Sequence, residues 1–300
     1  MRMLHQYRMI QHASLEEGGV GGHSMKVQVL EESYERIKVL FEGYPRIYVN
    51  AIRRAALSLV PVMAIDDVVI LENSSSFYDE VIAHRLAMVP LKTPVGKYVL
   101  PSECDCKSSL GCPRCRVLLV LDVEAGDKVR TVYSGELVSE DEDVKPISPN
   151  IPLLKLSPGQ KVKLEAYAKL GRGKDHAKWQ AASISVLKSY PIIVKGKSCD
   201  NCGACVDACV KNVLSIKEGL LQIDNPLNCS LCMECVRACK SEPKGISVEE
   251  AEDKFILIIE SVGSMSARDI LLNAVKELMS QVDKVIEGLS NVVVEVEKKG

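Results

Sequence analysis

The chain carries the sequence CDNCGACVDAC at residues 199–209 and the sequence CSLCMECVRAC at residues 229–239. Each segment places four cysteines at the spacing C-x2-C-x2-C-x3-C, and each cysteine of the second lies thirty positions after its counterpart. Disulfides are rare in reducing compartments, and a disulfide framework has no reason to repeat one spacing at a fixed offset. The repeat therefore predicts two equivalent loops that bind metal.

The spacing is the ligand pattern of two-cluster bacterial ferredoxins, in which the fourth cysteine of each segment ligates the other cluster. We therefore expect one 4Fe-4S cluster on Cys199, Cys202, Cys205 and Cys239, and a second on Cys209, Cys229, Cys232 and Cys235. Val210 and Lys240 stand where ferredoxins usually have proline, which loosens the match but removes no ligand. Loss of one iron would give a 3Fe-4S form, which the pattern does not distinguish. Structural zinc on the same thiolates is the competing interpretation, although zinc sites usually use paired C-x2-C motifs.

The remaining cysteines form a second kind of cluster. They are Cys104, Cys106, Cys112 and Cys115, at the spacing C-x-C-x5-C-x2-C. Four thiolates so close together, with Gly111 and Pro113 shaping the loop, favour a closed tetrahedral Zn2+ site of structural type. Metal-free thiols in a surface loop are the alternative.

Length and charge bound the possible functions. A chain of 300 residues, 47% of them hydrophobic, is long enough for about two domains. A formal net charge of -2 argues against direct nucleic-acid binding, because phosphate contacts need a basic surface. No apolar segment reaches the roughly 18–20 residues of a membrane helix, and residues 1–24 lack the apolar core of a signal peptide. We therefore expect a cytoplasmic protein, with residues 1–24 as a disordered leader or an over-long start assignment; a functional arm is the alternative.

Hydrophobic periodicity predicts a mixture of helices and strands. Alternation over 27–41 indicates a hairpin, and 47–60 has a helical apolar face that Pro61 ends. Further strands are expected at 68–71, 117–123, 131–133 and 162–168, a short helix at 79–86, and a loop at 139–152. In the cysteine-rich region, Lys217-Glu218-Gly219 should turn a hairpin between 213–216 and 220–223.

The C-terminal region predicts a strand at 255–260 and then a long helix capped by Ser266. Its apolar residues are spaced 4-3-4-3-4, as in the a and d positions of a coiled coil: Leu271, Val275, Leu278, Val282, Val285 and Leu289. A stripe this narrow favours a seam with a partner subunit. A helix that packs only against its own chain is the alternative.

Four segments together carry a resemblance. Residues 50–61 resemble the first helix of the α-type assembly subunits of cellular RNA polymerases, and 79–91 and 170–180 resemble two further motifs of that family. Residues 255–263 with the helix after them are similar to its C-terminal dimerisation segment. The ferredoxin-like insert and the 104–115 loop narrow the resemblance to the archaeal D-type members of that family, over about residues 25–295.

The resemblance implies an α+β fold with a split α-type dimerisation domain, formed by 25–65 plus 252–300. An inserted mixed β domain with the zinc loop would span 66–190, and a two-cluster ferredoxin-like domain 191–251. The implied function is that of a non-catalytic assembly subunit of DNA-directed RNA polymerase, which pairs with the small subunit L. The second-largest subunit and small subunits N and P would assemble on that pair.

Alternatives from other classes are a ferredoxin-type electron-transfer protein and a redox sensor. No aspartate triad for the polymerase Mg2+ is recognisable, so we expect no catalytic residue on this chain. His84 and His176 are predicted to be structural or interfacial. The basic stretch 169–178 is predicted to be a docking loop, because it lacks the glycine and lysine spacing of a phosphate-binding P-loop.

Overall fold

The computed structural model describes residues 25–297 except 107 and 109. The chain packs as two compact units. The scaffold unit contains Val29–Val39, Ile47–Lys188 and the described residues from Ile256 onward. The repeat unit contains the described residues up to Gln28, Leu40–Arg46 and Ser189–Phe255. The fold is mixed α+β, as the sequence predicts.

One four-stranded sheet has the order β1-β2-β12-β9. Its strands are β1 (Lys26–Glu32), β2 (Arg36–Glu42), β12 (Ile246–Ser261) and β9 (Ala182–Lys195). The predicted hairpin over 27–41 is confirmed as β1 and β2. The strands β9 and β12 are longer than any strand predicted there, and both continue from the scaffold unit into the repeat unit.

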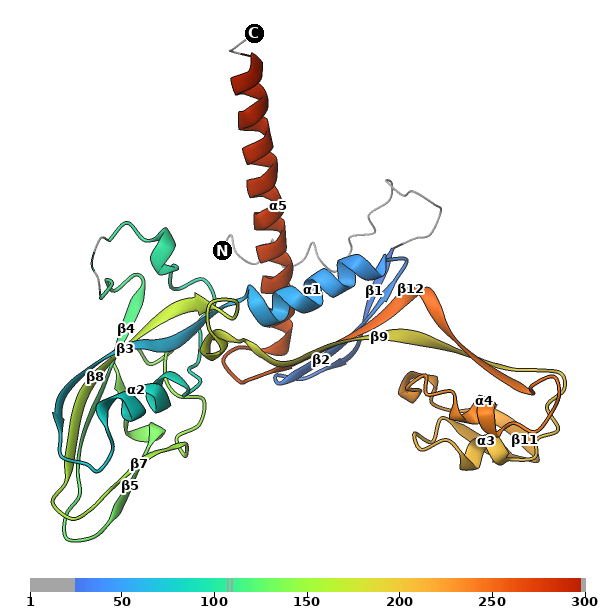
Figure 1. The fold of residues 1–300 in the computed structure, drawn as a ribbon, viewed down its shortest axis with the longest axis horizontal. Coiled ribbons are helices and arrows are strands. Elements are labelled where there is room, and N and C mark those ends of the chain that lie inside the picture. Colours follow the sequence, from blue (N-terminus) through green and yellow to red (C-terminus); the bar gives the residue numbers. More distant parts are fainter. Residues whose placement is uncertain (1–24, 107, 109, 298–300) are drawn as a thin grey trace, which may run out of the picture. The chain divides into compact units, whose positions relative to one another are not determined.

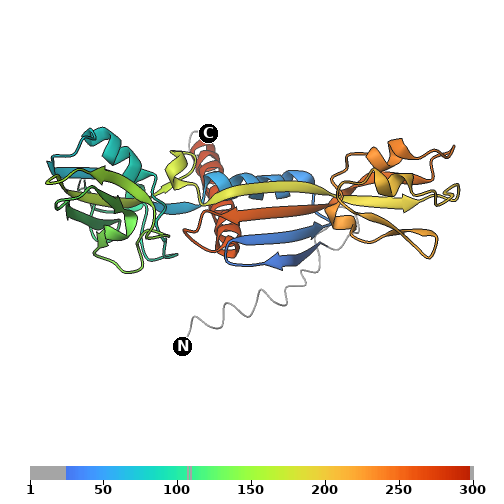
Figure 2. The same ribbon diagram turned by 90° about the horizontal axis from the view of Figure 1, so that it is seen from below.

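Helix α1 (Arg46–Ser58) lies along one face of this sheet (Figures 1 and 2). It buries Val49, Ala55 and Ala56. Of the apolar face that the periodicity indicates, Ala55 and Ala56 are buried, whereas Ile52 and Leu59 are half-buried. The Ser185 hydroxyl of β9 donates a hydrogen bond of 3.0 Å to the Arg53 carbonyl oxygen, which fixes the helix against the strand. The confirmed helix places the first of the polymerase-like motifs in the scaffold unit.

Helix α5 (Ala267–Glu297) follows β12. The backbone N–H of Asp269 donates to the Ser266 hydroxyl oxygen at 3.1 Å, so the predicted Ser266 cap is confirmed. Ala267, Ile270 and Ala274 are fully buried and anchor the first turns of the helix in the core of the scaffold unit.

The scaffold unit also contains a second four-stranded sheet, of order β3-β8-β4-β6. The strands are β3 (Pro61–Asn73), β8 (Lys161–Arg172), β4 (Arg116–Glu124) and β6 (Val138–Ser139), while β5 (Arg130–Tyr133) pairs with β7 (Pro152–Leu156). Helix α2 (Asp79–Ala87) packs Ile82 and Leu86 into the core between these strands. The strand expected at 68–71 begins earlier, at Pro61, because its antiparallel pairing with β8 extends to Pro61 opposite Arg172. Proline is tolerated at this first position of the strand.

The repeat unit adds α3 (Ala204–Asp207), β10 (Leu214–Lys217), β11 (Leu220–Ile223) and α4 (Glu234–Ala238). The strands β10 and β11 form the predicted hairpin, whose turn residues Glu218 and Gly219 both have positive φ, at 53° and 75°. The buried residues of the repeat unit cluster around the cysteines; they include Val213, Leu214, Ile246 and Val248. Among the described residues, no helix has the length and apolar character needed to cross a membrane.

Candidate metal centres

The two cysteine segments repeat in backbone conformation as well as in sequence. Asn201 and Leu231, thirty residues apart, both have φ of 58°, and Gly203 and Met233 have φ of 83° and 65°. In each segment, the second of these positive-φ residues (Gly203 or Met233) is followed directly by a short helix, α3 or α4, which carries the third cysteine of the segment. The chain therefore builds the same binding loop twice.

Two cavities of the repeat unit bring the eight cysteines together in crossed sets. One cavity is lined by Cys199, Cys202, Cys205 and Cys239. The other is lined by Cys209, Cys229, Cys232 and Cys235. Each set joins three thiols of one segment to the fourth thiol of the other, which is the donor set and connectivity of two 4Fe-4S clusters. The residues present therefore fit this cofactor.

Backbone N–H groups point at several of these sulfur atoms. Gly245 donates to Cys239 Sγ at 3.2 Å, and Val213 donates to Cys209 Sγ at 3.4 Å. The Gly245 contact is the main reason that the pKa of Cys239 lies below its usual value. Such donors favour the thiolate, the form that ligates metal.

Burial acts in the opposite direction on the third cysteine of each loop. It raises the pKa of Cys205 and of Cys235, and the charges of the neighbouring thiolates raise both further. Four thiolates confined to one cavity repel one another unless a cation lies between them. Bound iron would supply that positive charge.

Two further residues shape the first loop without carrying a recognisable sequence signal. The side-chain oxygen of Asn201 accepts hydrogen bonds from Leu221 N–H at 2.9 Å and from Lys195 Nζ at 2.8 Å. Gly245 lies so close to Cys199 that an added Cβ would be 2.7 Å from the Cys199 Cα. Neither the spacing of the cysteines nor the hydrophobic pattern indicates these contacts.

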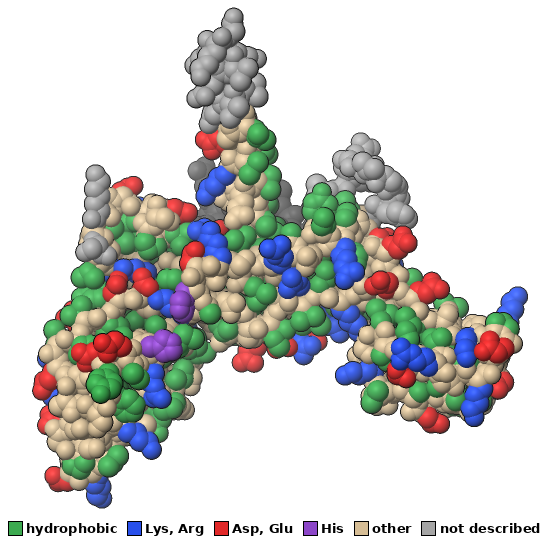
Figure 3. All heavy atoms as spheres, viewed as in Figure 1, with side chains coloured by type: hydrophobic (Ala, Val, Ile, Leu, Met, Phe, Trp, Pro, Cys, Tyr) green, Lys and Arg blue, Asp and Glu red, His purple; other side chains and the backbone are tan. Residues whose placement is uncertain are grey.

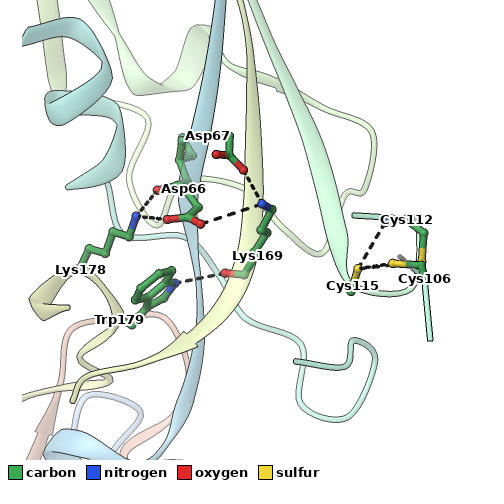
Figure 4. A network of polar contacts seen from close by, with 9 residues as sticks. Asp66, Asp67, Cys106, Cys112, Cys115, Lys169, Lys178 and Trp179 are labelled. Carbon is green, nitrogen blue, oxygen red and sulfur yellow. Dashed lines mark hydrogen bonds and ion pairs between the residues drawn. The ribbon is translucent and has the colours of Figure 1, made fainter. Parts of the chain in front are cut away.

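The loop at 104–115, in the scaffold unit, brings its four thiols within 4.8 Å of one another. The Sγ atom of Cys104 lies 3.4 Å from that of Cys106 and 3.7 Å from that of Cys112. The Sγ atom of Cys115 lies 3.6 Å from that of Cys106 and 3.9 Å from that of Cys112. Zn–S bonds of about 2.3 Å in a tetrahedron place sulfur atoms about 3.8 Å apart. Figure 4 shows three of these cysteines facing one another. The thiol geometry fits one zinc ion.

Hydrogen bonds shift the pKa values of two thiols of this loop in opposite directions. Hydrogen bonds with Cys104, Cys112 and Cys115 raise the pKa of Cys106 to about 12. A hydrogen bond from the Arg114 backbone lowers the pKa of Cys112 to about 7. Of these two thiols, Cys112 is the more readily deprotonated, and a divalent cation bound by the loop would displace protons from its ligands.

Comparison with known proteins identifies an RNA polymerase domain and an iron–sulfur domain in the chain. The RNA polymerase Rpb3/RpoA insert domain matches residues 57–192. The 4Fe-4S dicluster domain matches residues 185–244. The DNA-directed RNA polymerase subunit Rpo3 of Methanosphaera stadtmanae is 39% identical over 265 residues, which cover 87% of this chain and 97% of the relative. That of Archaeoglobus fulgidus is 42% identical over 265 residues, covering 87% and 98%. That of Pyrobaculum calidifontis is 40% identical over 269 residues, covering 88% and 96%.

The chain belongs to the archaeal Rpo3 family of DNA-directed RNA polymerase subunits. The α-type family that the sequence motifs indicate is thus supported, and its archaeal members carry the name Rpo3. Membership favours an assembly subunit over a free-standing electron carrier.

In this Rpo3-family chain, charged residues fix the third polymerase-like motif to β3 (Figure 4). Lys178 Nζ is 2.6 Å from an Asp66 carboxylate oxygen, and Lys169 forms an ion pair with Asp67. The indole N–H of Trp179 donates to the Lys169 carbonyl oxygen at 3.2 Å. The basic residues at both ends of the stretch 169–178 are therefore paired within the chain, and its exposed part is residues 174–177.

Among the described residues, no catalytic partner lies beside His84 or His176. His84 is exposed on α2. His176 is also exposed, and its Nδ1 accepts a hydrogen bond of 3.1 Å from Lys178 N–H while its ring meets Trp179 edge to face. The contacts of His176 are those of a residue that shapes its loop.

The Rpo3-family helix α5 changes character along its length. Of the predicted seam residues, Leu271, Val275 and Leu278 are half-buried, whereas Val282, Val285 and Leu289 are exposed. Met279 and Ile286 are exposed as well. Figure 3 shows hydrophobic side chains along this part of the helix. We call the five exposed residues the α5 apolar surface.

Proposed function

We infer that the chain is an assembly subunit of an archaeal DNA-directed RNA polymerase and that it supplies structure rather than catalysis. The α5 apolar surface carries this inference. Five large apolar side chains on one exposed stretch of helix are costly in water and favour burial against another helix. The partner in this proposal is the small α-like subunit L. The Mg2+-binding carboxylates of nucleotidyl transfer would lie on other subunits.

A charge placed on the α5 apolar surface tests the inference. Val285→Asp should abolish co-purification with L, because the seam would bury an unpaired carboxylate. Ser280→Asp adds the same charge on the opposite side of the helix and should leave co-purification unchanged. Equal binding of L by both variants would contradict the proposed seam.

The crossed cysteine sets would hold the two clusters, with Cys199, Cys202, Cys205 and Cys239 on the first and Cys209, Cys229, Cys232 and Cys235 on the second. The clusters would act by stabilising residues 195–248, since the buried cluster of this small segment is limited to Val213, Leu214, Leu221, Ile246 and Val248 with two of the cysteines. The double variant Cys202→Ser/Cys232→Ser should lose iron and bind the other subunits less well. Assembly equal to wild type would contradict a structural role for the clusters.

The 104–115 loop would hold one structural Zn2+ through Cys104, Cys106, Cys112 and Cys115. Its support is the set of sulfur–sulfur distances, which a tetrahedral ion requires. A closed site leaves no position for water, so the ion would fix the loop and take no part in chemistry.

The remaining partners in this proposal are those that the sequence resemblance implies. The second-largest subunit and the small subunits N and P would bind the pair formed with L, in the cytoplasm, and nucleic acid would be contacted only through the complex. Residues 174–177, exposed at the end of the stretch 169–178, are the docking surface we assign to one of the larger subunits. Lys174→Glu should weaken incorporation into the polymerase without changing the binding of L.

A further inference from the structure

The thirty-residue repeat gives the protein an internal comparison between its two cluster-binding loops. At two matched positions the backbone is left-handed in both loops, with φ between 58° and 83°. The first loop has asparagine and glycine at these positions, and the second has Leu231 and Met233. The conformation is therefore shared, while the residues that must adopt it differ.

The first loop adopts the conformation at little cost. Glycine has no Cβ and populates positive φ readily, and asparagine is among the few other residues that do so. Asn201 is further held there by the hydrogen bonds that its side-chain oxygen accepts from Leu221 and Lys195. Gly203 has nothing within 4 Å of an added Cβ, so only its φ of 83° selects for glycine.

The second loop adopts the same conformation with backbone strain. A left-handed backbone costs a non-glycine residue a factor of roughly 5–30 in an equilibrium constant. Leucine and methionine side chains offer no oxygen that could accept the hydrogen bonds made by asparagine. Both side chains are half-buried and pack against the apolar core of the repeat unit. A strained backbone persists only where its surroundings hold it, and here these would be the core together with the cluster bound by the loop.

We propose that Leu231 and Met233 make the second binding loop the weaker of the two, so that the cluster on Cys209, Cys229, Cys232 and Cys235 is lost first. Strain in a binding loop is relieved when its ligand leaves, so it reduces the free energy of binding. The chain would then pass through a state that retains only the cluster on Cys199, Cys202, Cys205 and Cys239. The inference rests on the two-cluster assignment proposed above.

Iron removal from the full chain tests the inference without any measurement of polymerase activity. The protein is purified anaerobically, and iron release to excess 2,2′-bipyridine is followed with time. Wild type should release its iron in two phases of equal size. Gly203→Ala introduces strain without a clash and should accelerate only the slow phase, by up to the factor given above.

Paired substitutions at Met233 separate strain from packing. Met233→Ala and Met233→Gly lose the same packing side chain, but only alanine keeps the cost of a Cβ at φ of 65°. The glycine variant should release iron in the fast phase several-fold more slowly than the alanine variant. Equal fast-phase rates in these two variants, or one uniform phase in wild type with full iron content, would overturn the inference alone. A chain purified without iron would overturn the cluster assignment and the inference with it.

Discussion

Truncating the α5 apolar surface should weaken the complex with L by an amount that the structure allows to be worked out. Leu289 is 63% exposed and Val282 is 57% exposed. Each buried CH2-sized group contributes about 0.8 kcal/mol. Leu289→Ala removes three such groups and Val282→Ala removes two. Scaled by the exposures, which are the fractions that the partner would bury, the losses of binding free energy should be about 1.5 kcal/mol and about 0.9 kcal/mol. The double variant should therefore bind L roughly 50-fold more weakly.

The measurement is the dissociation constant of the anaerobically purified chain with purified L, by isothermal titration calorimetry. Lys284→Ala, on the opposite side of the same helix, is the matched control and should bind as wild type does. Circular dichroism should show unchanged helix content in every variant, because alanine is a strong helix former. A double variant that binds L within threefold of wild type would refute the assignment of this surface to L.

Three further outcomes follow from the scaffold unit. An added Cβ at Gly173 would be 2.2 Å from the Leu57 carbonyl oxygen, so Gly173→Ala should lower the free energy of unfolding by about 1–3 kcal/mol, measured by thermal melting. Gly126→Ala, with open space around the added Cβ, should be neutral. Equal melting temperatures of the two variants would contradict the packing. Burial alone would raise the pKa of Asp141, but hydrogen bonds, foremost from Lys97, hold it below its ordinary value of 3.8. Its contribution to stability is thus present above about pH 4 and lost as pH falls further, so Asp141→Asn should flatten the acid limb of melting temperature against pH; an unchanged limb would exclude this contribution. Cys106→Ser should remove zinc while iron stays at the wild-type value by elemental analysis, and retention of zinc would contradict the four-thiol site.

The sequence predicts best the parts whose signal is local. Helix α1 follows from apolar periodicity, helix α2 follows the polar stretch at 73–76, and the β10–β11 hairpin follows from its turn residues. Within each segment the spacing of the first three cysteines likewise sets a short loop by local geometry. The crossing of Cys209 and Cys239 to the other segment's set is not local, and only the ferredoxin ligand pattern predicts it.

The long strands could not be predicted because distant pairing creates them. The segment 246–254 of β12 is rich in acidic residues and shows little alternation, yet it is strand, and the Asp253 carbonyl oxygen accepts a hydrogen bond from Gly43 N–H. Strand β9 contains Pro191, which argues against a central strand; β9 lies at the edge of its sheet, where proline is tolerated.

The candidate sites show the same limit. The heptad pattern of α5 does not tell where burial ends, and the residues that anchor the helix, Ile270 and Ala274, lie outside the predicted stripe. Left-handed backbone at Leu231 and Met233 runs against the preference of both residue types. Only the matched positions in the first loop, with asparagine and glycine, give a hint of it.

The most direct test of the assembly account is the composition of the complex formed by anaerobic co-expression with L. The account predicts a one-to-one heterodimer that contains about eight iron atoms and one zinc ion. A chain that carries its iron but purifies without L would contradict the account and favour an independent iron–sulfur protein.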